Sequence, residues 1–158
     1  MAYRRAAAWN PPEEGGSSEG LRSFLSRLPA SDGAHGRRFH YCSPHSDLLG
    51  WVIERAAGDS FASLAARCLM QPTGLANESY ITLDTYGAPR VAGGICMTAR
   101  DLARLGEMVR CGGAAGGRQV VPESWITDIR TRDTRSAWLA QTDGPRHFPN
   151  GCYRSKWY

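Results

Sequence analysis

The chain has 158 residues, of which 42% are hydrophobic and 22% are charged, a balance typical of a folded domain rather than a disordered tail. No stretch approaches the roughly 18 consecutive apolar residues of a membrane-spanning helix, so no membrane association is expected. The net charge of +4 is modest, and the basic residues occur in short runs interrupted by acidic ones. A nucleic-acid binder concentrates its positive charge on one face, so we expect no nucleic-acid partner.

The five cysteines are Cys42, Cys68, Cys96, Cys111 and Cys152. None of them forms a Cys-x-x-Cys pair, which argues against a zinc ribbon or a thioredoxin-type site. An odd number of scattered cysteines is typical of a protein kept in a reducing compartment. The N-terminal residues contain two arginines but no apolar core of a signal peptide. We therefore expect a cytoplasmic location.

Residues 1–18 are rich in Ala, Pro, Gly and Ser and predict an irregular lead-in. A first helix is expected to begin near Ser17 or Ser18 and to stop at Pro29. A second is expected from the cap Ser43 to Gly58, and a third from Asp59 or Ser60 to residue 72. The first two carry apolar residues at helical spacing, at Leu21, Phe24, Leu25 and Leu28 and at Leu49, Val52, Ile53, Ala56 and Ala57.

Residues 80–83 predict a strand, and residues 93–97 predict a turn that leads into a short apolar segment. Thr98 and Asp101 resemble a helix-capping box, followed by a helix with Leu102, Leu105, Met108 and Val109 inward. Two Gly-Gly pairs bracket a loop over residues 112–117, and a last helix is expected after Pro122, with Trp125, Ile126 and Ile129 inward. Residues 131–150 are predicted to be irregular. This pattern of helices with fragments of sheet excludes a parallel α/β fold.

A first candidate for chemistry is the run Tyr41-Cys42-Ser43, where an extended segment meets a helix N-terminus. The positive end of a helix favours anions, so it could lower the pKa of a tyrosine or cysteine or bind a substrate carboxylate. The alternative is purely structural, with Ser43 as a helix cap, Tyr41 packing and Cys42 filling space. Spacing alone leaves both possibilities open.

The sequence gives less support to two other kinds of site, a cysteine nucleophile and a metal site. Cys42 could act as a nucleophile with His40 or His45 as its base, although no orienting group is identifiable. A metal could bind among His35, His40, His45 and His147, but their spacing matches no standard zinc pattern and no carboxylate joins them.

Three blocks of sequence resemble serine hydrolases related to class C β-lactamases and penicillin-binding proteins. These blocks are Phe39–Gly58 with its Tyr-Cys-Ser triad, Val91–Gly106, and Gly112–Trp125, and together they cover most of residues 39–130. Within that family, the triad and the ending at residues 148–157 look most like 6-aminohexanoate-dimer hydrolases, which have carboxylesterase-like relatives. The resemblance implies an α/β fold of the α+β type, β-lactamase/transpeptidase-like, here mostly the helical subdomain with an incomplete antiparallel sheet.

The resemblance also implies a mechanism on a small-molecule amide or ester substrate, without a metal or an organic cofactor. A serine in a Ser-x-x-Lys motif attacks the carbonyl and is acylated, and water then releases the acid. Tyr41 matches the family tyrosine and is expected to act as general base and acid, helped by a nearby lysine ammonium. Ser43 matches the third position of the triad, where Asn is commoner, so its role is less defined.

Lysine is scarce, because 18 of the 19 basic residues are arginines and Lys156 is the only lysine. Tyr153 stands three residues before Lys156, so these 158 residues contain no Ser-x-x-Lys motif. The ending at residues 153–158 alternates polar and aromatic residues and predicts the start of a strand. We therefore expect residues 1–158 to be one partial hydrolase domain that lacks turnover by itself. The alternative is a non-catalytic binding protein that retains part of the fold, and the sequence does not predict an oligomeric state.

Overall fold

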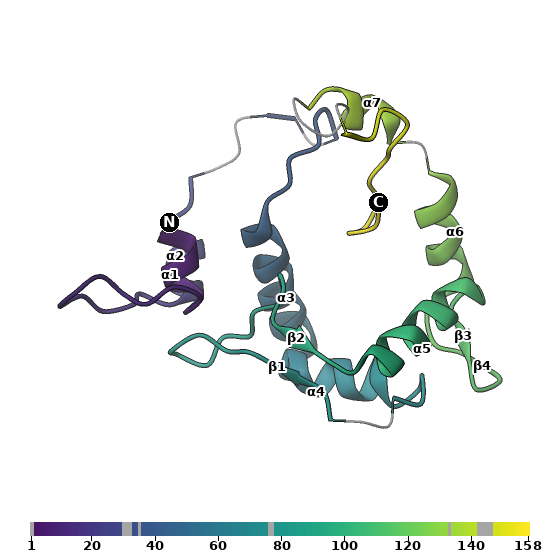
Figure 1. Cartoon of the computed structure of the whole chain (residues 1–158), viewed down its shortest axis with the longest axis horizontal. Coiled ribbons are helices and arrows are strands. Elements are labelled where there is room, and N and C mark those ends of the chain that lie inside the picture. The colour runs from purple at the N-terminus through teal and green to yellow at the C-terminus, as the bar shows by residue number, and fades with distance from the viewer. Residues whose placement is uncertain (1, 30–32, 35, 76–77, 133, 142–146) are drawn as a thin grey trace. The chain divides into compact units, whose positions relative to one another are not determined.

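A computed structural model describes residues 2–29, 33–34, 36–75, 78–132, 134–141 and 147–158 (Figure 1). The chain divides into two compact units, one of residues Met1–Pro29 and Cys42–Glu107, the other of Ala30–Tyr41 and Met108–Tyr158. Helices dominate both units, and the described strands are short and antiparallel. The predicted fold class is confirmed: the chain has a β-lactamase-like fold of helices with only small pieces of antiparallel sheet.

The first unit begins with a helix, α1, at Ala2–Ala6, where the sequence predicted an irregular lead-in. That prediction was wrong for this segment because alanine favours a helix and the burial of Ala6 stabilises it. Ala7 directly after α1 is fully buried, and it forms a small apolar core with Leu21 and Ala88, against which Tyr3 packs. The apolar side of the N-terminal segment thus supports the next helix.

Helix α2, Leu21–Ser26, follows the predicted stripe but not the predicted cap. Its N-cap is Gly20, and the Leu21 amide donates to Oδ2 of Asp84 at 2.7 Å. The hydroxyl of Ser18 instead accepts from the Gly20 amide and donates to the Arg5 carbonyl. A distant carboxylate therefore replaces the local serine cap, which sequence reasoning from neighbouring residues could not detect.

Helix α3, Ser43–Ala57, begins one residue earlier than predicted, because its N-cap is Cys42 rather than Ser43. It ends as expected at Gly58, whose left-handed φ of 66° allows its amide to donate to the Glu54 carbonyl. The inward face is the reverse of the prediction: Asp47 and Gly50 are buried, while the apolar stripe is exposed. Gly50 is required there, since an added Cβ would collide with Val91.

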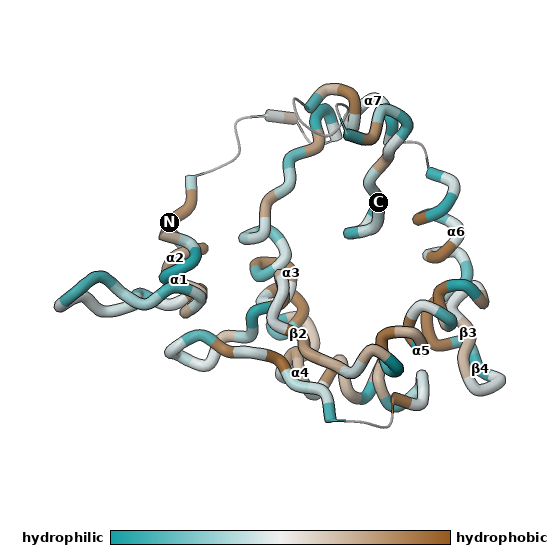
Figure 2. Tube along the Cα trace, viewed as in Figure 1, coloured by the Kyte–Doolittle hydropathy of each residue, from teal (hydrophilic) through white to brown (hydrophobic). Residues whose placement is uncertain are grey.

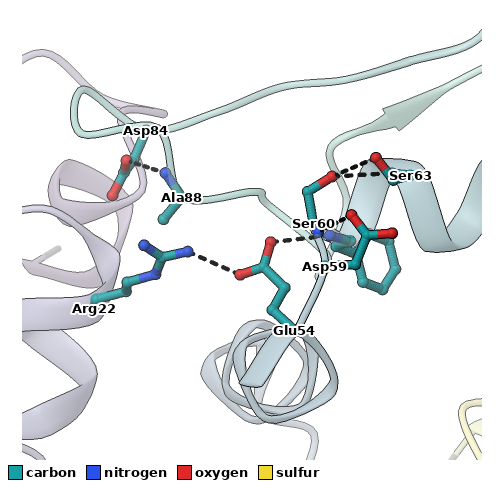
Figure 3. A network of polar contacts seen from close by, with 8 residues as sticks. Arg22, Glu54, Asp59, Ser60, Ser63, Asp84 and Ala88 are labelled. Carbon is teal, nitrogen blue, oxygen red and sulfur yellow. Dashed lines mark hydrogen bonds and ion pairs between the residues drawn. The ribbon is translucent and has the colours of Figure 1, made fainter. Parts of the chain in front are cut away.

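Helix α4, Phe61–Ala65, continues as the π-helical turn η1, Ala66–Met70. The predicted cap is confirmed, because the Ser60 hydroxyl accepts from the Ser63 amide at 3.1 Å. Figure 3 shows how Glu54 of α3 ties this junction to α2: its carboxylate pairs with Arg22 at 2.8 Å and accepts from the Phe61 amide at 3.0 Å.

Strands β1, Tyr80–Ile81, and β2, Ile95–Cys96, pair antiparallel with Tyr80 opposite Cys96. The predicted capping box before α5, Ala99–Arg110, is confirmed: Thr98 Oγ1 accepts from the Asp101 amide and donates to its carboxylate. Asp101 is fully buried and also pairs with Arg104. Met108 faces inward as predicted, but Leu102 is exposed.

The second unit contains a hairpin of β3, Ala114–Ala115, and β4, Arg118–Gln119, where only a loop was predicted. Gly116 and Gly117 both have positive φ, as a two-residue hairpin turn requires. Helix α6, Glu123–Thr131, buries Ile126 but leaves Trp125 exposed. Helix α7, Arg135–Leu139, lies in a segment predicted to be irregular, and it is held by the burial of Trp138.

The end of the chain forms a tight reversal rather than the predicted start of a strand. Arg154 and Trp157 exchange backbone hydrogen bonds of 2.8 and 2.9 Å. Between them, Ser155 and Lys156 have φ values of 49° and 73°, which extended backbone does not allow. None of the helices in the described parts of the chain is long and apolar enough to cross a lipid bilayer.

Candidate functional site

Tyr41, the predicted general base and acid, lines a cavity of about 590 Å³ within the second unit. It is 63% exposed, and it lies in residues 39–42, which have no regular secondary structure and lead into α3. The cavity is lined by Phe39, Tyr41, Trp138, Gln141, His147, Phe148, Gly151, Cys152 and Tyr158. This volume falls within the usual range of small-molecule sites.

Aromatic rings form most of the cavity wall and pack against one another. The Phe39 ring lies 5.4 Å from that of Trp138 and 4.4 Å from that of Tyr153, measured between centroids. The Tyr158 ring meets those of Trp138 and Tyr153 edge to face, at 5.9 and 4.9 Å. Such tilted and edge-to-face pairs are the preferred geometry of aromatic side chains.

Hydrogen bonds fix the segments that carry these rings. The Phe39 amide donates to the Ala137 carbonyl at 2.9 Å, which attaches the Tyr41 segment to α7. The Trp138 indole Nε1–H donates to the Phe148 carbonyl at 2.9 Å. Thr134 Oγ1 accepts from the Tyr153 amide and donates to its carbonyl, so the last residues of the chain are also held.

Burial shifts the pKa of two tyrosines near the cavity, Tyr153 and Tyr158. Loss of solvent raises the pKa of Tyr153 and of Tyr158, and the neighbouring Tyr41 raises both further. No lysine or arginine is among the described residues that line the cavity. The ammonium that the resemblance places beside the tyrosine therefore does not come from these residues.

Ser43 is the first residue of α3 and belongs to the other unit, and its N-cap neighbour Cys42 is extended, with φ −140° and ψ 101°. Cys42 and His45 share a backbone hydrogen bond, from the His45 amide to the Cys42 carbonyl at 3.1 Å, rather than a thiol–imidazole contact. No cluster of three metal-ligating side chains occurs in the part of the chain that the structure describes, and His35 lies outside it.

Sequence reasoning missed the residues that enclose Tyr41, above all Trp138, Gln141, Phe148 and Tyr158. They are separated from Tyr41 by about a hundred residues of sequence and are brought to it by α7 and the terminal reversal. The available signal was the density of aromatic residues between Phe148 and Tyr158, which was interpreted only as a strand.

The beta-lactamase family matches this chain over residues 2–157. This range is wider than residues 39–130, which carry the three blocks of resemblance in the sequence. A 6-aminohexanoate-dimer hydrolase of Paenarthrobacter ureafaciens is 32% identical over 158 residues, which is 100% of this chain and 39% of that protein. The chain therefore spans about two fifths of the length of this curated relative.

Two solved structures share the fold. A candidate 6-aminohexanoate-dimer hydrolase from Bacillus anthracis aligns with a TM-score of 0.74 and 23% identity, covering 82% of this chain and 34% of that one. A candidate beta-lactamase from Bacteroides dorei DSM 17855 aligns with a TM-score of 0.61 and 22% identity, covering 86% and 43%. With the family match over nearly every residue, the chain belongs to the beta-lactamase family.

Proposed function

We propose that this chain carries the proton-transfer part of a serine hydrolase that cleaves linear amides or esters. The observation that supports the proposal most directly is the 32% identity, over all 158 residues, to a 6-aminohexanoate-dimer hydrolase. The position of Tyr41 on the wall of a cavity large enough for a small molecule agrees with it.

In the proposed mechanism, a serine hydroxyl attacks the carbonyl carbon and forms a tetrahedral intermediate. Tyr41, as phenolate, accepts the serine proton and then donates it to the departing amine or alcohol, which leaves an acyl-serine. Water then attacks the acyl group, with Tyr41 again taking and returning the proton. Ser43 is proposed to hydrogen-bond the lysine of this machinery or the substrate.

The chain itself supplies the tyrosine but not the nucleophile. These 158 residues contain no Ser-x-x-Lys motif, and they also lack the Lys-Thr-Gly type of motif found in related hydrolases, since Lys156 is followed by Trp157-Tyr158. We therefore expect the 158-residue chain to show no turnover of p-nitrophenyl esters above the rate of a denatured control.

The test is a chimera in which residues 1–158 replace the matching 39% of the Paenarthrobacter enzyme, which would supply the serine and lysine. We expect the chimera to hydrolyse p-nitrophenyl acetate, and the linear 6-aminohexanoate dimer more slowly. Tyr41→Phe should then lower kcat by roughly 10²–10⁴-fold, the usual contribution of a positioned general acid–base group.

Tyr86→Phe is the matched control, because Tyr86 is also an exposed tyrosine and lies in the first unit. Equal activity of the two variants would refute the role of Tyr41. A folded chimera without any turnover would favour the alternative, a non-catalytic binding protein. The observation that favours this alternative is that these 158 residues contain no Ser-x-x-Lys nucleophile.

A further inference from the structure

We propose that the cavity beside Tyr41 takes the aryl part of a neutral amide or ester, in preference to a flexible zwitterion such as an aminohexanoate dimer. That the aryl group belongs to a substrate rests on the proposed function. That the cavity binds an aryl group does not, because the cavity lies within one unit of the chain and binding needs no nucleophile.

The shape of the wall is the first argument. Five of the described lining residues are Phe, Tyr or Trp, namely Phe39, Tyr41, Trp138, Phe148 and Tyr158. The rings of Phe39, Trp138 and Tyr158 already meet at tilted and edge-to-face angles, so the ring of a ligand can pack against them in the same geometry. An aromatic ligand gains contact energy from such geometry beyond the area that it buries, and an aliphatic chain does not.

The charge of the wall is the second argument. None of the described lining residues is an Asp, Glu, Lys or Arg. A zwitterion would have to place its ammonium and carboxylate groups against a largely apolar wall that offers no Asp, Glu, Lys or Arg side chain among the described lining residues, which is costly. A neutral amide or ester avoids this cost.

A polar side chain on the wall, Gln141, supplies a third reason, because it offers a hydrogen-bond donor. The Gln141 side chain lines the cavity, and its Nε2 is buried without a hydrogen-bond partner among the described residues. Buried amide nitrogens are nearly always satisfied, so an unpartnered one on a cavity wall marks a place for an acceptor. The carbonyl oxygen of an amide or ester is such an acceptor. Together with the aromatic wall, this favours one class of ligand, a neutral amide or ester that carries an aryl group.

The experiment is titration calorimetry of the full 158-residue chain at pH 8, which keeps ordinary histidines neutral. Three probes are compared: 4-phenylbutanamide, hexanamide and the linear 6-aminohexanoate dimer. We expect 4-phenylbutanamide to bind roughly two- to tenfold more tightly than hexanamide, the range expected for aromatic pairing. The zwitterionic dimer should bind most weakly.

Variants then locate the binding. Tyr158→Ala and Phe148→Ala remove exposed rings of the wall, so each should weaken 4-phenylbutanamide at least threefold without unfolding the unit. Gln141→Leu keeps the size of the side chain but removes the donor, and it should weaken binding by roughly two- to tenfold. Trp125→Ala is the matched control, because Trp125 is an exposed aromatic residue of the same unit that does not line the cavity.

Binding of the dimer as tight as that of the aryl amide would overturn the proposal, as would undetectable aryl binding or an equal loss in Trp125→Ala. These outcomes differ from failure of the proposed function. An inactive chimera with intact aryl binding refutes the hydrolase role alone, and an active chimera without aryl binding refutes only the ligand class.

Discussion

Asp84 is a single buried side chain that holds several backbone segments of the first unit together. Its carboxylate is buried and accepts three backbone hydrogen bonds, from the amides of Leu21 at 2.7 Å, Tyr86 at 2.9 Å and Ala88 at 2.8 Å. Leu21 and Ala88 are also core residues, so the same carboxylate caps α2, shapes the 84–88 turn and aligns the core. Figure 3 shows its hydrogen bond with the Ala88 amide. Its negative charge suits the N-terminus of a helix.

Replacing Asp84 by Ala should therefore lower the free energy of unfolding of the first unit by about 2–4 kcal/mol, because it leaves buried amides without an acceptor as well as removing the cap of α2. Urea unfolding would measure this loss, and hydrogen exchange should accelerate at the amides of Leu21 and Ala88. Glu13→Ala is the control, since Glu13 forms only an exposed ion pair with Arg5, worth roughly 0–1 kcal/mol. Equal effects of the two changes would show that Asp84 is not an organising residue.

At the scale of elements, an ion pair connects α6 to the terminal reversal. Arg154 Nε donates to Asp128 Oδ2 at 2.6 Å, and Arg132 lies 3.6 Å from the other carboxylate oxygen. The hydrogen bond from Arg154, followed by the positive charges of Arg154 and Arg132, holds the pKa of Asp128 below its usual value. A carboxylate with a lowered pKa stabilises the folded form above its ordinary pKa and loses that effect as the pH falls through the lowered one.

The terminal reversal should accordingly be intact at pH 6 and loosen as the pH falls below the ordinary range of aspartate. In Asp128→Asn it should already be loose at pH 6 and show no further acid step. Backbone amide exchange at Trp157 reports this, because that amide donates to Arg154 within the reversal. Asp59→Asn breaks a comparable pair, with Arg67 in the first unit, and should leave Trp157 unchanged.

Sequence patterns predicted correctly those element boundaries that depend on interactions between neighbouring residues. Local signals succeeded where the interaction itself is local, as at the Thr98–Asp101 box, the Ser60 cap and the Gly58 terminus. They failed where a partner lies far along the chain, as for the cap of α2. Tyr41 could be singled out by resemblance, but its surroundings depend on a packing of α7 with residues 148–158 that no local pattern encodes.

For the whole molecule, the decisive feature is the apolar face of α3, a helix whose trace in Figure 2 carries hydrophobic residues among hydrophilic ones. Leu49, Val52 and Ile53 are 49%, 53% and 37% exposed, although their spacing is that of a buried stripe. The core of the first unit, by contrast, rests on Ala7, Leu21 and Ala88, two of which are small. Contiguous exposed apolar surface favours self-association and loose packing.

We therefore expect the purified chain to bind the dye ANS in native buffer and to associate as its concentration rises, without a sharp cooperative thermal transition. Val52→Lys places a charge at the centre of the α3 face and should reduce both dye binding and the sedimentation coefficient at high concentration. Leu102→Lys alters an exposed leucine of α5 outside that face and should have little effect. A monomer with a sharp transition, or equal responses to the two lysines, would show that the α3 face does not govern the behaviour of the chain.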